Sequence, residues 1–219
     1  MSEENQAGQE RERTFWYTMA RGFTFLMTHL FYPVTYHNAA VCDQAGACIV
    51  VANHKHWLDP LLVGSRFKRH EVVFLGKKEL VHTKLAERLM KRLHMIVVDR
   101  HNSDLKAMRE CIQTVRKGHV LGIFPEGTRC RETTLAHLET GCAFIALRCK
   151  APLVPVLIDR PCRLWRRTHV YFGQPLQVEE LYQGVTDAAA AEEMNRRIRA
   201  GILALSPAPR LPDGTITHE

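Results

Sequence analysis

Short apolar runs alternate with amphipathic stretches along most of this 219-residue chain. Continuous or β-branched apolar runs predict buried strands at 47–52, 72–75, 95–98, 120–124 and 153–158. Between and after them, apolar positions spaced three or four residues apart predict helices over about 103–117, 141–148 and 187–205. Strands that alternate with helices in this way predict an α/β fold, with a mixed, mostly parallel sheet flanked by helices.

The segment before the first predicted strand is rich in aromatic residues. Residues 14–32 hold seven of the chain's 17 aromatic side chains, and Arg21 is their only formal charge. A helix of this length spans roughly 28 Å, close to the thickness of a bilayer core. Its polar and apolar residues nevertheless fall on different sides: Thr14, Thr18, Arg21 and Thr28 on one, Phe15, Met19, Phe23, Leu26 and Leu30 on the other. This division predicts an amphipathic helix in the membrane interface. The alternative is a helix packed on the domain's own core.

The rest of the chain predicts one domain with short tails. Pro33 ends the N-terminal helix, which therefore occupies residues 14–33 and follows a polar tail at 1–13. The α/β domain covers 34–206, where we find no internal repeat and no second domain. Residues 207–219 are rich in proline and are expected to form a loose C-terminal tail.

The charge of the chain is unevenly distributed. Lys and Arg number 30 and Asp and Glu 23, which gives a formal net charge of +7. One basic cluster lies between Arg66 and His94, and a second surrounds Trp165 with Arg160, Arg163, Arg166 and Arg167. A basic surface of this kind suits nucleic acid, an anionic bilayer or a phosphorylated small molecule. Charge alone does not choose among them. A composition of 46% hydrophobic and 24% charged residues does exclude a disordered chain and a polytopic membrane protein.

The cysteines predict neither a disulfide framework nor a metal site. There are seven, an odd number, and no two of them form a C-x-x-C pair. The polar first 13 residues do not resemble a secretory leader. We therefore expect reduced thiols in a cytosolic compartment, and no bound metal.

Two loops that follow predicted strands carry candidate chemistry. After 47–52 the chain reads Asn53-His54-Lys55-His56-Trp57-Leu58-Asp59-Pro60. On a regular helix, His54 and Asp59 would diverge by about 140°, so they meet only if His54 lies on the turn and Asp59 in the following helix. Asp59 would then orient the imidazole and stabilise its cation, as in a catalytic triad whose nucleophile comes from the substrate. From chemistry alone, His56 is an equal candidate for the working histidine.

The second loop follows 120–124 and reads Phe124-Pro125-Glu126-Gly127-Thr128-Arg129. Gly127 allows close approach of a ligand to the backbone, and Thr128 and Arg129 offer ligands for a phosphate. Glu126 could steer Arg129 or accept a hydrogen bond from a hydroxyl group. The alternative is an ordinary turn stabilised by a salt bridge.

Together these blocks resemble the 1-acylglycerol-3-phosphate (lysophosphatidic acid) acyltransferase family of glycerolipid acyltransferases. His54 and Asp59 match its His-x4-Asp block, and Phe124–Arg129 matches its FPEGTR block intact. Val97-Val98-Asp99-Arg100 resembles its second block and Val154-Pro155-Val156 its fourth, while Gly76–Leu80 resembles a segment whose lysine reaches the acceptor phosphate. Two positions depart from the family pattern. His56 stands where the family often has Ser, and Ile158 where the fourth block usually closes with Pro.

The resemblance implies an enzyme that transfers an acyl chain from acyl-CoA or acyl carrier protein to the 2-hydroxyl of 1-acyl-glycerol 3-phosphate, forming phosphatidic acid in phospholipid biosynthesis. It implies His54 as the general base and Asp59 as its orienting partner. The residues implied to hold or shape the site of the acceptor phosphate are Lys77, Arg100, Glu126, Gly127, Thr128 and Arg129. No metal or other cofactor is implied, because the thioester of the acyl donor is already activated.

The resemblance also gives the aromatic segment and the basic clusters a common role. Both would dock residues 34–206, as an acyltransferase domain, on the anionic cytoplasmic face of a membrane, where the protein would be peripheral or monotopic. Two alternatives stay open. Another acceptor, such as glycerol 3-phosphate, dihydroxyacetone phosphate or a lysophospholipid, would fit the same blocks. A non-catalytic lipid- or nucleic-acid-binding protein would use the basic surface but would have no need of a base beside a phosphate site.

Overall fold

The computed structural model describes residues 15–44, 46–78, 83–98, 105–130, 135–178 and 187–207. Its strands form one seven-stranded sheet in the order β1-β7-β6-β2-β5-β3-β4. They are β1 (Val34–His37), β2 (Ile49–Ala52), β3 (Val72–Lys77), β4 (Ile96–Val98), β5 (Val120–Ile123), β6 (Leu153–Ile158) and β7 (Thr168–Phe172). All neighbouring pairs are parallel except β6 and β7. The single-domain α/β fold with a mixed, mostly parallel sheet is therefore confirmed.

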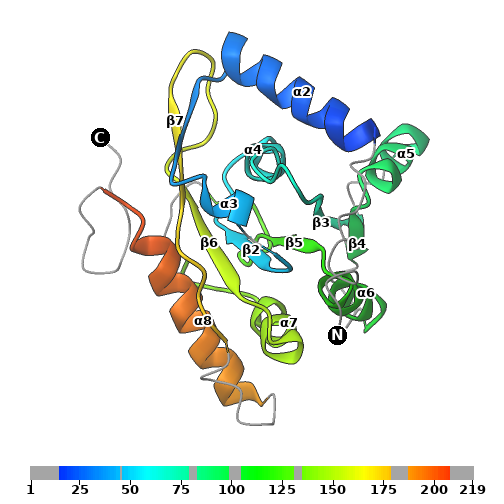
Figure 1. Ribbon diagram of the computed structural model, residues 1–219, viewed down its shortest axis with the longest axis vertical. Helices are drawn as coiled ribbons and strands as arrows, with labels where there is room; N and C mark the ends of the chain where they lie inside the picture. Colours follow the sequence, from blue (N-terminus) through cyan, green and yellow to red (C-terminus); the bar gives the residue numbers. More distant parts are fainter. Residues whose placement is uncertain are drawn as a thin grey trace.

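Helices cover both faces of this sheet (Figure 1). They are α2 (Phe15–Leu30), α3 (Val41–Gln44), α4 (Asp59–Gly64), α5 (Lys84–Arg92), α6 (Leu105–Arg116), α7 (Thr140–Cys149) and α8 (Ala188–Leu203). One face packs on α6, α7 and α8 and the other on α3 and α4, so the sheet separates two hydrophobic cores. Strand β2 shows the division, because Ile49 and Val51 enter the first core while Val50 and Ala52 enter the second.

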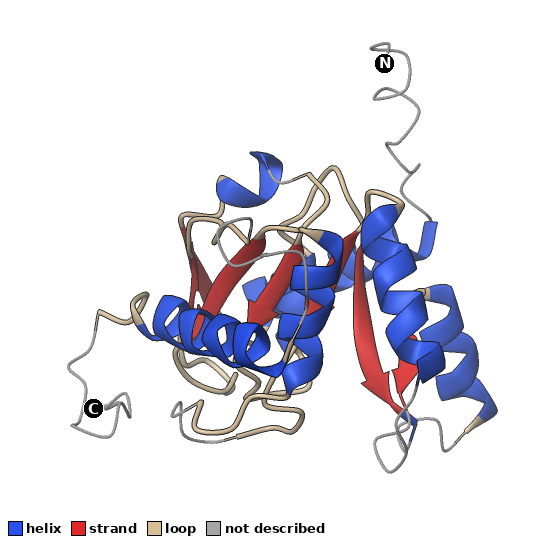
Figure 2. Ribbon diagram, turned by 90° about the horizontal axis from the view of Figure 1, so that it is seen from below, coloured by secondary structure: helices blue, strands red, loops and turns tan. Residues whose placement is uncertain are grey.

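The five predicted strands and the three predicted helices of the domain are present, with ends that differ by a few residues. The sequence pattern did not predict strands β1 and β7 or the three short helices α3, α4 and α5. Strands β1 and β7 are short and carry polar residues between their apolar ones, as in Thr168-His169-Val170-Tyr171-Phe172. The six-residue α4 and the highly charged α5 lack a long apolar stripe. Figure 2 shows the helices, in blue, packed beside the strands of the sheet, in red. The expected tail at 1–13 and nearly all of the tail at 207–219 lie outside the described residues.

The N-terminal helix α2 has its polar side toward the protein and its apolar side toward solvent. Tyr17 and Thr24 are its buried residues, and the Tyr17 hydroxyl donates a 2.7 Å hydrogen bond to the Gly64 carbonyl of α4. Its exposed large apolar side chains are Phe15, Met19, Phe23, Phe25, Leu26 and Leu30. The helix lies across α4 in Figure 1. It therefore packs on the domain without burying its apolar stripe. In the described part of the chain, no helix is both long enough and apolar enough to cross a bilayer.

The parallel register brings the two candidate loops together. Val51 of β2 pairs with Ile123 of β5, and three residues after each of them the chain reaches His54 and Glu126. Phe74 of β3 pairs with Gly122 of β5, and three residues after Phe74 lies Lys77. Because parallel strands end at the same edge of the sheet, these side chains gather at its carboxyl edge, where α/β proteins bind ligands.

Candidate active site

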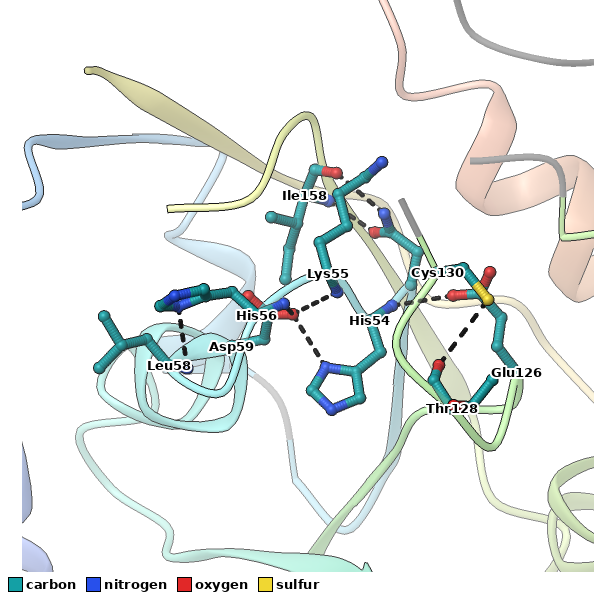
Figure 3. Close-up of polar contacts among 10 residues, drawn as sticks. His54, Lys55, His56, Leu58, Asp59, Glu126, Thr128, Cys130 and Ile158 are labelled. Carbon is teal, nitrogen blue, oxygen red and sulfur yellow. Dashed lines mark hydrogen bonds and ion pairs between the residues drawn. The ribbon is translucent and has the colours of Figure 1, made fainter. Parts of the chain in front are cut away.

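The central contact of the site joins His54 to Asp59. The imidazole Nδ1 lies 2.9 Å from the carboxylate Oδ2 (Figure 3). His54 is on the loop after β2, and Asp59 is the first residue of α4, so the loop bends back and the pair meets as the sequence required. A carboxylate only accepts hydrogen bonds, so Nδ1 carries the proton and Nε2 is left as a base. The Asp59 side chain is fully buried, whereas that of His54 is 18% exposed.

Asp59 also organises the backbone of the loop. The same oxygen, Oδ2, accepts hydrogen bonds from the backbone N–H groups of Lys55 at 2.6 Å and His56 at 2.7 Å. Its second oxygen, Oδ1, is buried without a hydrogen-bond partner among the described residues. Three donors on one buried oxygen hold the carboxylate in a single orientation, and that orientation fixes the imidazole ring of His54.

Glu126 holds His54 from the opposite side. Its Oε2 accepts a 2.9 Å hydrogen bond from the backbone N–H of His54, which ties the FPEGTR loop to the His-x4-Asp loop. The Cys130 N–H donates to the His54 carbonyl at 2.8 Å and makes a second connection. Burial raises the pKa of Glu126 above its ordinary value, while the hydrogen bond from the His54 N–H opposes that rise. The Glu126 carboxylate thus positions the histidine, and Glu126 is not among the described residues that line the cleft.

Two further residues support His54, and the sequence reading did not assign them a role. Asn53 is buried, and its amide group donates to the Ile158 carbonyl at 2.9 Å and accepts from the Ile158 N–H at 2.7 Å. It thereby continues the pairing of β2 with β6 beyond the end of the strand. The Phe124 ring stacks on the His54 imidazole, with ring centroids 4.2 Å apart. A polar residue next to an apolar strand and directly before the histidine was the available signal for Asn53.

The neighbouring Lys55 and His56 point away from the cleft. The Lys55 side chain is buried and extends in the opposite direction from the His54 imidazole (Figure 3). Burial lowers the pKa of Lys55, and the nearby carboxylates of Glu126 and Asp159 oppose this effect. His56 Nδ1 faces the Leu58 N–H at 3.4 Å, and burial lowers the pKa of its imidazole. His54 lines the cleft and His56 is not among the described residues that do, so of the two histidines His54 is the one placed to meet a ligand there.

A large cleft opens beside His54. Its volume is about 630 Å³, within the range of pockets that bind drug-sized or larger ligands. The polar side chains at its wall include Arg21, His54, Lys77, Thr128 and Arg129. Its other walls are mainly apolar and come from α2, α4, β3, β4, β5, α6 and α7, with residues such as Met95, Met108, Cys111, Ile123 and Ile145. One cavity therefore joins a base and several cations to an extended apolar surface.

The residues expected at the phosphate site divide into three groups. Lys77, Gly127, Thr128 and Arg129 line the cleft together with His54. Gly127 has a φ of 70°, a conformation that glycine adopts without strain and that allows the tight turn before Thr128. Glu126 contacts the backbone of His54, as described above. Arg100 lies outside the described residues.

A mostly parallel α/β sheet thus places a histidine, held by a buried carboxylate, in an apolar cleft that also carries cationic side chains, and this arrangement suits an acyltransferase. The comparisons with known proteins agree with this class. The Acyltransferase family model matches residues 33–159, more than half of the chain, and the protein belongs to that family.

Similar proteins extend the same picture. The chain is 29% identical over 159 residues to the 1-acyl-sn-glycerol-3-phosphate acyltransferase of Bacillus subtilis, covering 69% of this chain and 79% of that protein. It is 27% identical over 185 residues to the enzyme of the same name from Streptococcus pneumoniae, covering 81% of this chain and 68% of that one. The crystal structure of the 1-acyl-sn-glycerophosphate acyltransferase PlsC from Thermotoga maritima aligns over 96% of this chain and 86% of its own, with a TM-score of 0.67. At 19% identity that likeness concerns the fold.

Proposed function

We propose that this acyltransferase moves an acyl chain from the thioester of acyl-CoA or acyl carrier protein to the 2-hydroxyl of 1-acyl-glycerol 3-phosphate, forming phosphatidic acid. The observation that carries the proposal is the shared cleft of His54, Lys77 and Arg129. It sets a base oriented by a buried carboxylate beside cations suited to a phosphate, in a cavity with apolar walls. The relatives named for this reaction in Bacillus and Streptococcus support the choice of acceptor.

The chemistry follows from the tautomer of His54. Nδ1–H donates to Asp59, so Nε2 is free to take the proton of the acceptor hydroxyl. The hydroxyl oxygen then attacks the thioester carbonyl, and the imidazolium that forms is stabilised by the Asp59 carboxylate. When the tetrahedral intermediate collapses, the C–S bond breaks and the thiolate leaves with the proton returned by His54. The new ester bond and the free thiol balance the reaction without a metal or a redox step.

The hydrogen bonds around His54 restrict how the oxyanion can be stabilised. The backbone N–H of His54 donates to Glu126, and those of Lys55 and His56 donate to Asp59. These three donors are occupied. The oxyanion is therefore assigned to donors on the cleft wall, of which Thr128 and Arg129 lie on the loop that is tied to His54 through Glu126.

The membrane is the proposed source of the lipid acceptor. The exposed apolar face of α2 has the composition of an interfacial helix, and the cleft is lined by Tyr17, Ala20, Arg21 and Thr24 from the other side of the same helix. A helix that lies in the lipid surface and roofs the cleft would let an acceptor enter without crossing water. Since α2 covers α4 and the cleft, deleting it would disturb the domain, and point substitutions on its exposed face are the cleaner variants.

The function is tested with the full-length protein and labelled acyl-CoA or acyl carrier protein in the presence of vesicles. The acceptors are 1-acyl-glycerol 3-phosphate, glycerol 3-phosphate, dihydroxyacetone phosphate and lysophosphatidylcholine. We expect 1-acyl-glycerol 3-phosphate to give the highest kcat/KM and phosphatidic acid as product. A higher kcat/KM with another acceptor would assign the protein to that substrate.

Membrane docking through α2 is tested separately by vesicle co-sedimentation. A Met19→Ser/Leu26→Ser/Leu30→Ser variant should lose vesicle binding but keep its melting temperature, because all three side chains are exposed.

A further inference from the structure

The loop between β6 and β7 has an exposed apolar tip. The side chains at this tip, Leu164 and Trp165, are 54% and 76% exposed. Trp165 also has a φ of 54°, a left-handed conformation that is uncommon and strained for a bulky side chain. Packing within the described fold does not account for a strained residue that buries so little of its ring. A contact outside the chain would account for both features.

The loop is fixed to the C-terminal end of α2. The Trp165 N–H donates a 2.8 Å hydrogen bond to the carbonyl of Phe31, and the Thr168 N–H donates to the carbonyl of Pro33 at 2.9 Å. An isolated antiparallel β-bridge between the backbones of Arg163 and Arg166 closes the turn. In Figure 1 the loop reaches the level of α2 beside the end of that helix. Phe31, Leu164 and Trp165 are all exposed, so apolar side chains are presented to solvent by both segments where the loop is bonded to the end of α2.

Cations surround this tip. The side chains of Arg163, Arg166 and Arg167 are exposed, and Arg167 donates to the Thr35 hydroxyl at 3.0 Å. Arg160 pairs with Asp159, but Arg163 and Arg166 form no ion pair within the described residues. An apolar tip flanked by exposed cations matches the surface of an anionic bilayer, where phosphates lie above the acyl chains. Nucleic acid would use the cations but would leave Leu164 without a partner.

We propose that residues 163–167 form a second membrane-inserting element, in which Leu164 and Trp165 enter the interface of an anionic bilayer and Arg163 and Arg166 bind its phosphates. A protein that is held on a membrane by one interfacial helix can still rotate about the axis of that helix. A second contact at the end of α2 removes that freedom and fixes how the cleft faces the lipid. This inference rests on the membrane docking in the proposed function and adds a contact that is independent of α2.

Binding is measured with the full-length protein and vesicles of phosphatidylcholine, with and without phosphatidylglycerol. We expect Leu164→Ser/Trp165→Ser and Arg163→Gln/Arg166→Gln each to weaken binding to the anionic vesicles by about tenfold or more. The arginine variant should also reduce the salt dependence of binding. Leu105→Ser, which removes another exposed leucine on α6, and Lys106→Gln/Arg109→Gln are the matched controls. Loop variants that bind like the wild type would overturn the proposal.

Insertion of the ring is measured by fluorescence quenching with brominated phospholipids. The chain has three tryptophans, so the wild type is compared with Trp165→Phe, which keeps an aromatic anchor but removes one emitter. We expect the wild type to be quenched more strongly than Trp165→Phe, because the most exposed ring is the one that reaches the lipid. Equal quenching of the two proteins would show that Trp165 stays out of the bilayer and would overturn the proposal.

Activity separates a failure of this inference from a failure of the proposed function. The loop variants should lose activity on acceptor in vesicles but keep wild-type activity on a short-chain, water-soluble lysophosphatidic acid. If the wild type fails to bind anionic vesicles yet acylates the soluble acceptor, the loop proposal is overturned and the reaction stands. If it binds through the loop but acylates neither form of the acceptor, the loop proposal holds and the proposed reaction is wrong.

Discussion

The Nδ1 atom of His54 lies 2.9 Å from the Oδ2 atom of Asp59, an oxygen that also accepts the N–H groups of Lys55 and His56. The orientation of the imidazole is therefore set by a carboxylate that is itself held by the backbone. The imidazole is thus held in place before any ligand binds, and this preorganisation underlies the first two predictions.

Replacing His54 should remove catalysis without unfolding the protein. We expect His54→Ala to lower kcat/KM by about 10²–10⁴-fold, because the general base is lost. His56→Ala is the matched control and should cost far less, since His56 faces Leu58 and not the cleft. Circular dichroism melts accompany the kinetic assay for both variants. A loss of activity in His56→Ala together with activity in His54→Ala would reverse the assignment.

Asp59→Asn should harm both stability and activity. The Asn oxygen can replace Oδ2 and accept the three donors, but the amide NH2 then takes the position of Oδ1, which is buried without a partner among the described residues. A buried unsatisfied donor costs about 1–3 kcal/mol, and the imidazolium also loses its counter-charge. We expect a lower melting temperature and a reduced kcat with little change in KM. Unchanged kcat would mean that Asp59 acts only in folding.

The cations of the cleft should act on the acceptor. Arg129→Ala removes charge-assisted hydrogen bonds worth roughly 1.5–3 kcal/mol, so the acceptor KM should rise or kcat/KM fall by about tenfold or more. Lys77→Ala should act in the same direction. The donor KM should stay nearly constant, and Arg148→Ala, an exposed arginine on α7, is the control. Equal changes in the donor and acceptor KM would indicate that Arg129 and Lys77 bind the phosphates of CoA or only support the fold.

The apolar wall of the cleft should limit the length of the acyl chain. A Cβ atom added at Gly141 on α7 would lie 3.6 Å from the Met108 Cε, an ordinary contact, so Gly141→Ala should fold normally. Gly141→Leu places a larger side chain beside the same wall. We expect Gly141→Leu to lower kcat/KM most for the longest acyl-CoA donors, with Gly141→Ala as the control. An equal loss for all donor lengths would place the acyl chain elsewhere.

Glu126 should leave a signature in the pH dependence of stability. Burial raises the pKa of this carboxyl group, so the folded protein holds the proton more tightly than the unfolded chain. The contribution of Glu126 to the free energy of unfolding is therefore highest below pH 4.5 and falls as pH rises through the folded-state pKa. Thermal melts of Glu126→Gln between pH 4 and pH 7 should lack this decrease, whereas Glu192→Gln, at an exposed position on α8, should keep it. If the melting temperatures of the wild type and Glu126→Gln changed with pH in parallel, Glu126 would not contribute to the pH dependence of stability.

The sequence by itself determined the fold class and the chemical groups of the site. The apolar runs at 49–52, 120–123 and 153–158 are continuous because these strands are buried on both faces, and this pattern is visible without a structure. The His-x4-Asp block singled out His54 and Asp59, and the FPEGTR block singled out Glu126, Thr128 and Arg129, because each block is a short run of consecutive sequence. Short polar strands such as β1 and β7 gave no such signal.

Only the tertiary structure decided what each group contacts. Glu126 is separated from His54 by 72 positions, and their hydrogen bond exists because the register of β2 and β5 ends the two strands side by side. The choice between His54 and His56 depended in the same way on which side chain the fold turns toward the cleft. For α2, the sequence specified an amphipathic helix, but only packing on α4 showed that its apolar side remains exposed. Periodicity reports local geometry, whereas contacts between distant segments depend on how the sheet aligns them.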